Sequence, residues 1–159
     1  MVDLEALHGR LRAGGATVAV AESLTGGLLC AALTTTPGAS ATMRGGLVVY
    51  ATELKALLAG VPAELLAERG AVDPDVARAL AVGARERLGA TYGLGVTGVA
   101  GPEPQDGKPV GTVWAALAGP DTTEISQVVV TGSREEIRLS AVEACLELLD
   151  RESRRVASR

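Results

Sequence analysis

The sequence predicts an α/β domain: three layers, α/β/α, around a mixed, mostly parallel sheet of about five strands. Short apolar runs alternate with helical patterns through the first two thirds of the chain. Two further strand patterns follow with only a short turn between them, which favours an antiparallel hairpin. The 159 residues contain no Phe, one Trp and two Tyr, so small aliphatic side chains must fill the core. This length predicts one compact domain over residues 1–159.

The first third of the chain predicts two helices and two strands, followed by a third helix. Apolar residues spaced as on one helix face indicate a helix over 2–11, which ends at a Gly pair. A short apolar run at 17–21 predicts a strand, and the Ala-rich segment 28–35 predicts a helix. A β-branched pair within 45–51 predicts the second strand. A helix is expected over 52–58, with Thr52 as its cap.

The middle and last thirds continue the alternation. Pro62 starts a short helix through Glu68, and Asp73-Pro74-Asp75 caps a longer one that runs to about Leu88. Strands are expected over 92–99, 111–117 and 124–131. Ser133 and Glu136 fit a capping box. This box opens a long final helix whose inward side chains are Ile137, Val142, Cys145, Leu146 and Leu149, followed by a polar, frayed tail from Arg151.

Composition excludes several classes of protein. The net charge is −4, and no Lys/Arg cluster alternates with aromatic residues, so we expect no nucleic-acid partner. No apolar run reaches the ~18–20 residues of a membrane span, and the first residues resemble an amphipathic helix more than a signal peptide. Cys30 and Cys145 lie in helical apolar patterns and are expected to be reduced core residues. These features predict a cytoplasmic protein.

The segment from Glu22 to Gly27 joins the first strand to the following helix. A serine on such a turn, Ser23, lies where free backbone N–H groups and the positive end of a helix meet. That position suits a nucleophile whose product carries an oxyanion, and it suits a phosphate site equally well. The turn itself leaves both alternatives open.

Several familiar sites are not expected. The only histidine, His8, belongs to the first helix and is expected to be an ordinary surface residue, so no Ser-His-Asp triad is predicted. Two helical cysteines and one remote histidine do not supply a zinc site. Pro102 follows Gly101 where a P-loop needs lysine, and no dinucleotide-binding glycine motif follows the first strand. No metal or organic cofactor is expected.

A lysine can take the proton of a serine nucleophile when burial lowers its pKa. The chain has two lysines. Lys55 follows a strand directed into the domain, whereas Lys108 lies in a polar loop where solvent should keep it charged. Tyr50 ends that strand, and its hydroxyl could bridge Ser23 and Lys55. The alternative for these three residues is a capping serine, an aromatic residue at a strand end and a lysine whose amine reaches solvent.

A second glycine-rich stretch, Gly93 to Pro102, leads from a strand into a loop. Small residues there let a backbone approach a ligand closely, although a plain tight turn would use them as well. Ligands of open α/β sheets collect at the carboxyl ends of strands. Ser23, Tyr50 and Thr97 each lie at or near such an end.

Five segments in this order resemble a known family. They are 21-AESLTGG-27, 45-GGLVVY-50 with Lys55 following, 70-GAV-72, 95-GVTGVAGP-102 and 109-PVGTVW-114. With them the chain resembles the C-terminal domain of the competence/damage-inducible protein CinA, a family that includes stand-alone nicotinamide-nucleotide amidohydrolases (PncC). The resemblance covers about residues 18–149. No segment of this sequence resembles the N-terminal domain of full-length CinA, which favours the stand-alone form.

The resemblance implies hydrolysis of the carboxamide of nicotinamide mononucleotide (NMN), in pyridine nucleotide recycling. It implies a serine/lysine amidase with a tyrosine nearby, matching Ser23, Lys55 and Tyr50, and it favours a homo-oligomer. Thr52 and Asp73 stand where the family often has Asn and Ser, and both are plausible helix caps. The residues expected to contact this small-molecule nucleotide are Glu22, Thr25, Gly26, Gly27, Arg44, Thr97, Gly98, Ala100 and Gly101.

Within this hypothesis, N–H groups at Thr25-Gly26 and near Thr97-Gly98 hold the oxyanion, and Arg44 helps to bind the 5′-phosphate. Glu22 is expected to orient backbone or ribose and not to act as the base. Two alternatives remain open. One is a non-catalytic nucleotide-binding or regulatory module linked to competence or DNA damage, which the same glycines would serve. The other is an amidase of a different pyridine or nucleotide carboxamide.

Overall fold

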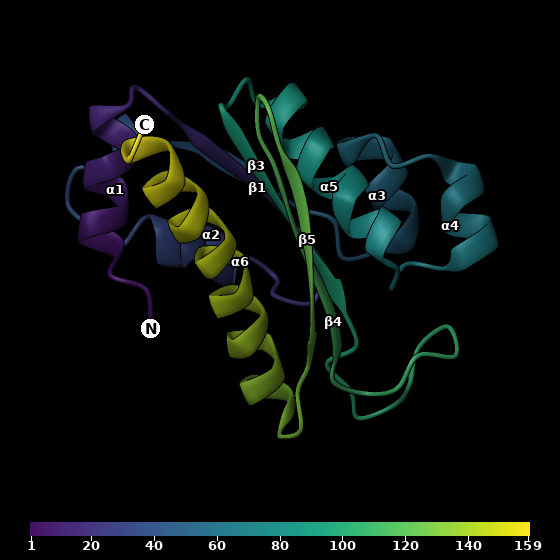
Figure 1. The fold of residues 1–159 in the computed structure, drawn as a ribbon. Coiled ribbons are helices and arrows are strands. Elements are labelled where there is room, and N and C mark those ends of the chain that lie inside the picture. The colour runs from purple at the N-terminus through teal and green to yellow at the C-terminus, as the bar shows by residue number, and fades with distance from the viewer.

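The computed structural model describes residues 1–159 as one five-stranded sheet with helices on both of its faces (Figure 1). The strands lie in the order β2-β1-β3-β4-β5. β1 pairs in parallel with β2 and β3, while β4 is antiparallel to β3 and β5. Only β4 is therefore reversed, as expected for a mixed sheet with a late hairpin. The strands are β1 (Val18–Glu22), β2 (Met43–Val48), β3 (Tyr92–Gly98), β4 (Thr112–Ala118) and β5 (Thr123–Val129).

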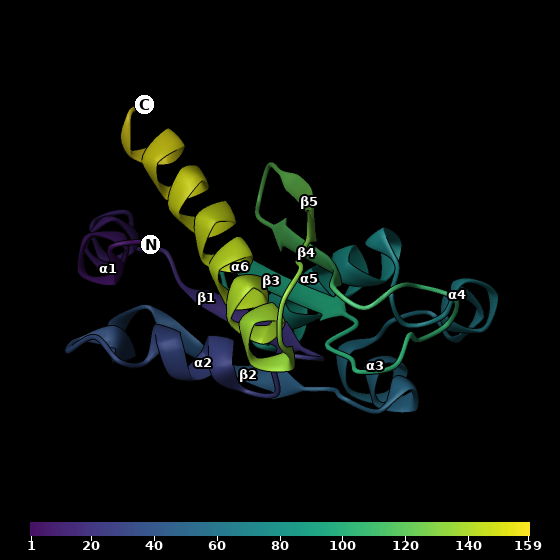
Figure 2. The same ribbon diagram turned by 90° about the horizontal axis from the view of Figure 1, so that it is seen from below.

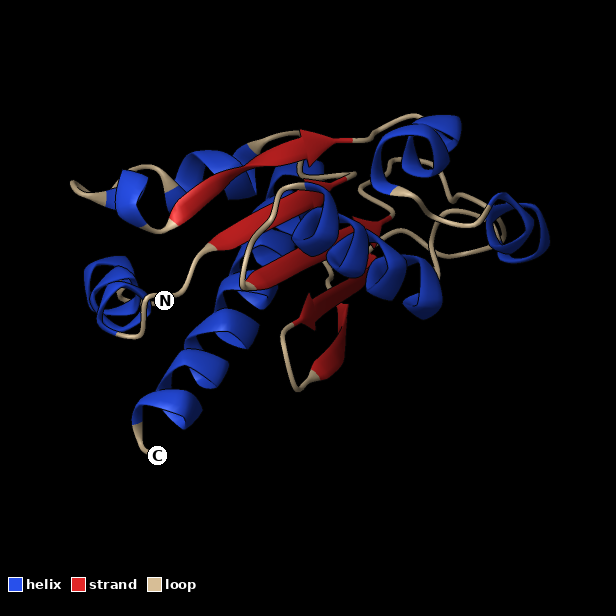
Figure 3. Ribbon diagram, turned by 90° about the horizontal axis from the view of Figure 1, so that it is seen from above, coloured by secondary structure: helices blue, strands red, loops and turns tan.

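Two layers of helices enclose this sheet, which confirms the three-layer α/β/α prediction. In Figure 1, α1, α2 and α6 lie on one side of the sheet and α3, α4 and α5 on the other, and Figure 3 shows the strands side by side across the molecule. None of the helices combines the length and apolar character needed to cross a membrane. The helices are α1 (Leu4–Ala13), α2 (Leu28–Leu33), α3 (Thr52–Ala59), α4 (Ala63–Arg69), α5 (Pro74–Arg87) and α6 (Arg134–Ala157), with a 3-10 turn at Ala39–Ala41.

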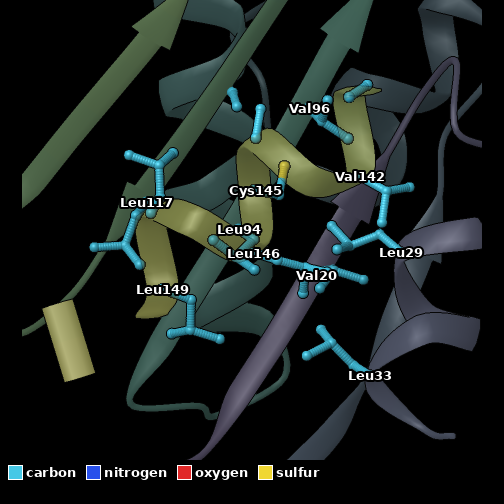
Figure 4. Close-up of a cluster of buried hydrophobic side chains, with 14 of the residues drawn as sticks. Val20, Leu29, Leu33, Leu94, Val96, Leu117, Val142, Cys145, Leu146 and Leu149 are labelled. Carbon is cyan, nitrogen blue, oxygen red and sulfur yellow. The ribbon is translucent and has the colours of Figure 1, made fainter. Parts of the chain in front are cut away.

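The larger core lies between α6 and the sheet (Figure 4). Side chains of α6 meet the strands at Val20, Leu94 and Leu117, and α2 adds Leu29 and Leu33 at the side. The five side chains of the final helix that were expected to face inward are all buried, which confirms that prediction: Ile137, Val142, Cys145, Leu146 and Leu149.

On the other face, α5 packs unusually close to β3 because two glycines of the strand face it. A Cβ on Gly95 would lie 2.4 Å from the carbonyl oxygen of Ala77, and a Cβ on Gly93 would lie 1.9 Å from that of Ala81. No side chain fits in either place. This contact explains how a core almost without aromatic residues still closes.

The helix caps agree with the sequence in two cases of three. The side chain of Asp73 accepts from the N–H of Asp75 at the start of α5, and Ser133 and Glu136 form the predicted capping box of α6. The prediction for Thr52 was wrong, because Ala51 occupies the cap position of α3 and no side chain caps it.

Two other expectations were also wrong. His8 is fully buried and not a surface residue: its Nδ1 lies 2.6 Å from Oγ1 of Thr42, and burial lowers its pKa. The segment after Arg151 is not a frayed tail, because α6 continues to Ala157 with Glu152 buried. His8 lies in α1 against the residue that precedes β2, and Glu152 lies in the last turns of α6. Cys30 and Cys145 are both free thiols as expected, but only Cys145 is a buried core residue, and Cys30 is half-buried.

Candidate active site

Ser23 follows the last residue of β1 at the carboxyl edge of the sheet. Its N–H donates to the carbonyl of Val96 at 3.1 Å, so the backbone is held by β3. The side chain is 7% exposed, and its hydroxyl makes no hydrogen bond within the chain. It borders a cavity of about 550 Å³. The lining residues are Ser23, Leu24, Tyr50, Ala51, Thr52, Gly98, Val99, Ala100, Gly101, Pro102, Glu103, Pro104, Gln105 and Arg134.

Glu22, the residue before Ser23, is buried, and its side chain caps the start of α2. Its carboxylate accepts from the N–H groups of Gly27 at 3.2 Å, Leu29 at 2.9 Å and Cys30 at 2.9 Å. These are the donors that a short helix leaves without partners. Glu22 therefore satisfies the start of α2 internally, and neither Glu22 nor Gly27 lines the cavity.

Other backbone donors near Ser23 are free. The N–H groups of Leu24 and Thr25 have no partner within the chain, whereas that of Gly26 donates back to the carbonyl of Ser23 at 3.1 Å. The hydroxyl of Thr25 is fully buried, also without a partner. The free donors therefore lie one residue earlier than the Thr25-Gly26 pair that the sequence suggested.

Across the cavity, the loop after β3 supplies a second set of donors. Thr97 is buried, and its hydroxyl donates to the carbonyl of Ala71 at 2.7 Å, so it ties β3 to the segment before α5 and does not reach the cavity. Gly98 does line the cavity. The N–H groups of Ala100 and Gly101 have no partner within the chain.

Lys55 is the most unusual side chain of the site, because it is only 1% exposed. It lies in the first turn of α3, and its Nζ donates to the carbonyls of Val49 at 2.8 Å and Tyr50 at 3.1 Å. No carboxylate forms an ion pair with it. Burial lowers the pKa of Lys55 from 10.5 to about 8, although Glu53 and Asp106 act weakly in the other direction.

The strand register brings Lys55 to Ser23. Glu22 pairs with Val48, and the N–H of Val49 donates to the carbonyl of Glu22 at 2.8 Å, so Val49 lies beside Ser23. Neighbouring strands are about 4.8 Å apart. The carbonyl of Val49 thus holds the amine of Lys55 on the segment beside Ser23, although Lys55 itself does not line the cavity. No hydrogen bond joins the two side chains in this structure, and such contacts commonly tighten only with substrate bound.

Tyr50 lies at the cavity, but not as a bridge between Ser23 and Lys55. β2 ends at Val48, and the ring of Tyr50 is 61% exposed. Its hydroxyl accepts from Nη2 of Arg134 at 3.3 Å. Only its backbone carbonyl contacts Lys55.

Two arginines of α6 complete the site, and the sequence reading missed both. Arg134 lines the cavity and donates to the carbonyl of Gly101. Arg138 supports the serine turn, because its Nε donates to the carbonyl of Leu24 at 2.9 Å and its Nη2 to that of Thr25 at 3.3 Å. No local motif marks either residue, since their roles depend on where α6 returns to the sheet.

Arg44 is not part of this site. It lies near the start of β2, at the opposite edge of the sheet, where its Nε donates to the carbonyl of Leu88 at 3.0 Å. It lines a separate hollow that includes Cys30. Arg134 is instead the one cationic side chain among the residues that line the Ser23 cavity.

The loop between β3 and β4 forms the outer wall of the cavity, and Figure 2 shows it reaching toward α3 and α4. Asp106 fastens it there: its carboxylate accepts from the N–H of Ala71 at 3.1 Å. Thr97 holds the carbonyl of the same residue, so Ala71 is fixed from both sides. The loop and the segment before α5 are therefore held together beside Lys55.

This geometry defines an α/β domain with a serine at the carboxyl end of β1 and a buried lysine without an ion pair in α3, the helix that follows the neighbouring parallel strand. The chain belongs to the CinA C-terminal domain family, whose model matches residues 3–153. That finding confirms the resemblance seen in the sequence.

Similar proteins agree with this membership. A CinA-like protein of Frankia casuarinae is 58% identical over 136 residues, and one of Acidobacterium capsulatum is 50% identical over 138 residues; each match covers 86% of this chain. These matches cover 31% and 33% of the relatives, so the chain spans about a third of their length.

Solved structures of the superfamily have the same fold. A CinA superfamily protein of Klebsiella pneumoniae matches with a TM-score of 0.90 and 31% identity, over 97% of this chain and 99% of that one. A CinA superfamily protein of Escherichia coli matches with a TM-score of 0.88 and 33% identity, over 92% of this chain and 87% of that one.

Proposed function

We propose that this chain is an amidohydrolase that converts NMN to nicotinic acid mononucleotide and ammonia, with Ser23 as nucleophile and Lys55 as base. The observation that carries the proposal is the burial of Lys55 without a carboxylate partner, on a carbonyl of the segment that pairs with the strand leading into Ser23. At a pKa of about 8, about one Lys55 amine in ten is neutral at pH 7. At the ordinary value, only a few in ten thousand would be.

The contacts of Lys55 suit a neutral amine. Such an amine has two N–H bonds and one lone pair, and the carbonyls of Val49 and Tyr50 accept from two N–H bonds. The lone pair is then left to take the proton of Ser23. A charged Lys55 would have to place its third N–H in a site without a carboxylate.

The reaction follows in two halves. As Lys55 takes the serine proton, Oγ of Ser23 attacks the carboxamide carbon and forms a tetrahedral oxyanion. The free N–H groups of Leu24 and Thr25, or of Ala100 and Gly101, are the available donors for that oxyanion. The C–N bond then breaks, and ammonia leaves with the proton that Lys55 held. Water cleaves the ester, giving the acid and restoring Ser23.

Arg134 and Tyr50 are proposed to bind the nucleotide. Arg134 is a cation at the cavity and is linked to the hydroxyl of Tyr50, so a phosphate would find a charged and a neutral donor together. The cavity of about 550 Å³ falls within the usual range for small-molecule sites. Binding of a nucleotide and assembly into a homo-oligomer both stay predictions.

The test is ammonia release from NMN. We expect Ser23→Ala and Lys55→Met to lower kcat by about a thousandfold or more, as loss of a nucleophile or its base does. Lys108→Met is the matched control, because it removes the other lysine, which is not buried and whose side chain makes no hydrogen bond within the chain. Wild-type turnover in either site variant would contradict the proposal. If NMN raises the Tm of the wild-type chain without releasing ammonia, the non-catalytic binding module is supported instead.

A second experiment tests the substrate. Arg134→Gln should raise KM for NMN about tenfold while leaving KM for nicotinamide riboside, which lacks the phosphate, nearly unchanged. An equal effect on both substrates would show that Arg134 does not contact phosphate. A panel of other pyridine carboxamides separates NMN hydrolysis from a related amidase activity.

A further inference from the structure

A second cavity, of about 500 Å³, lies at the opposite edge of the sheet from Ser23. Its walls come from the end of α1, the start of β3, the turn after β4 and the last turns of α6. Figure 1 shows the C-terminal end of α6 beside α1 in this region. The two cavities have no lining residue in common, so this one is separate from the proposed active site.

Tyr92 is the buried polar side chain of this cavity. It is 4% exposed, and its hydroxyl has no hydrogen-bond partner within the chain. The ring packs against Gly119, where a Cβ would lie 2.9 Å from Cε1 of the tyrosine. Unlike the hydroxyl of Thr25, that of Tyr92 is not enclosed by protein atoms, so a ligand can reach it from the cavity. The ring is thus held in place while its O–H group is left for a ligand.

The charged side chains of the cavity are largely paired already. Glu152 is 5% exposed, and its two oxygens accept from Arg155 at 2.6 and 2.7 Å. Arg10 forms an ion pair with Asp150. Asp121 and Arg159 also line the cavity, but both are exposed and their charges are opposite.

This pairing determines the kind of ligand that fits. The two charged groups of the cavity without an ion-pair partner, Asp121 and Arg159, are exposed, so a buried ligand charge would lose its hydration and gain only a screened counter-charge. An uncharged molecule avoids that cost. Apolar surface for its body is provided by Leu11, Ala16 and Val156.

We propose that this cavity is a second binding site, for an uncharged molecule of one or two aromatic rings with one hydrogen-bond acceptor. The acceptor receives the O–H of Tyr92, and the rings lie against Leu11, Ala16 and Val156. The site does not depend on amidase activity at Ser23. β3 and α6 contribute residues to both cavities.

The experiment uses acetophenone, which combines one ring with one carbonyl, and follows backbone amide shifts of the whole chain by NMR. Saturable shift changes are expected to centre on residues 11–16, 91–92 and 152–157. Tyr92→Phe keeps the ring and removes only the O–H, and should weaken binding about five- to tenfold. Tyr50→Phe is the matched control at the other cavity and should leave acetophenone binding unchanged.

Two comparison ligands test the chemical class. Toluene lacks the acceptor and benzoate carries a charge, and each should bind at least fivefold more weakly than acetophenone. Val156→Trp, which fills the cavity from the exposed side of α6, should abolish binding. The proposal is overturned if acetophenone does not bind, if its shift changes centre on the Ser23 cavity, if Tyr92→Phe binds as tightly as wild type, or if benzoate binds more tightly.

Discussion

The Nζ atom of Lys55 lies 2.8 Å from the carbonyl oxygen of Val49, and the N–H of Val49 in turn donates to the carbonyl of Glu22, the residue before Ser23. The lysine is therefore tied to the strand pair that carries the serine. Because Lys55 is buried and has no carboxylate partner, its neutral form is favoured beyond that of an ordinary lysine. The proposed chemistry depends on this relationship.

The pH dependence of turnover should report Lys55. A base has to be neutral to accept a proton, so kcat/KM for NMN should rise with pH and level off above a pKa of about 8. Steady-state ammonia release between pH 6 and pH 10 measures this curve. A curve that is flat across pH 8 would argue against a lysine base.

Lys55→Met should stabilise the fold while it removes activity. Below pH 8 the wild-type chain must keep a charged lysine buried, at a cost of about 3 kcal/mol for a pKa lowered from 10.5 to about 8. The variant also loses the two hydrogen bonds from Lys55 to the carbonyls of Val49 and Tyr50, which offsets part of this gain in stability. We expect the variant to be about 1–3 kcal/mol more stable at pH 7 in urea unfolding.

The same urea experiment, repeated at several pH values, tests whether the free energy of unfolding rises with pH as the lowered pKa of Lys55 requires. Between pH 8 and pH 10.5 the unfolded chain still binds the proton that the folded chain has released, so wild-type stability rises with pH. The advantage of Lys55→Met should therefore shrink over this interval, while Lys108→Met shows no such trend. A constant difference from pH 7 to pH 10 would contradict the lowered pKa.

Glu22→Gln should destabilise the fold but leave the pH dependence of turnover, which reports Lys55, unchanged. The carboxylate accepts from three N–H groups at the start of α2, and an amide offers one oxygen in its place. We expect the free energy of unfolding in urea to fall by about 1–3 kcal/mol. The exposed control Glu64→Gln should lower it by less than about 0.5 kcal/mol. A pH–rate curve that loses its rise near pH 8 in this variant would instead make Glu22 part of the proton relay.

Gly95→Ala and Gly9→Ala form a matched pair for the packing of α5. The new Cβ at position 95 would lie 2.4 Å from the carbonyl oxygen of Ala77, which should cost about 3 kcal/mol or more. At position 9, inside α1, nothing lies within 4 Å, and alanine should stabilise the helix by about 0.5–1 kcal/mol. Thermal unfolding of both variants measures the difference. Equal effects would show that α5 can move away from β3.

The sequence predicted the features that depend on local patterns. Ser23 on a strand-to-helix turn, Lys55 in the first turn of the next helix and the cap at Asp73 follow from a few neighbouring residues. Tyr50 was placed in the right region but with the wrong orientation, because β2 ends two residues before it and the alternation of side chains no longer applies.

Features that depend on distant segments could not be predicted from one sequence. Arg134 and Arg138 reach the site only because α6 crosses the sheet and returns to the serine turn. Arg44 was expected to help bind the phosphate, although it lies near the start of β2, at the opposite edge of the sheet from Ser23. The burial of His8 likewise involves a distant residue, because Thr42, 34 residues along the chain, lies 2.6 Å from its Nδ1.

The most direct test of the account is an NMR titration of the Lys55 side chain. The chain has two lysines, so a 13C-lysine sample gives two side-chain signals, and Lys108→Arg assigns them. We expect the Cε signal of Lys55 to titrate with a midpoint near pH 8. A midpoint above pH 10 would contradict this, because only a few Lys55 amines in ten thousand would then be neutral at pH 7 and able to take the proton of Ser23.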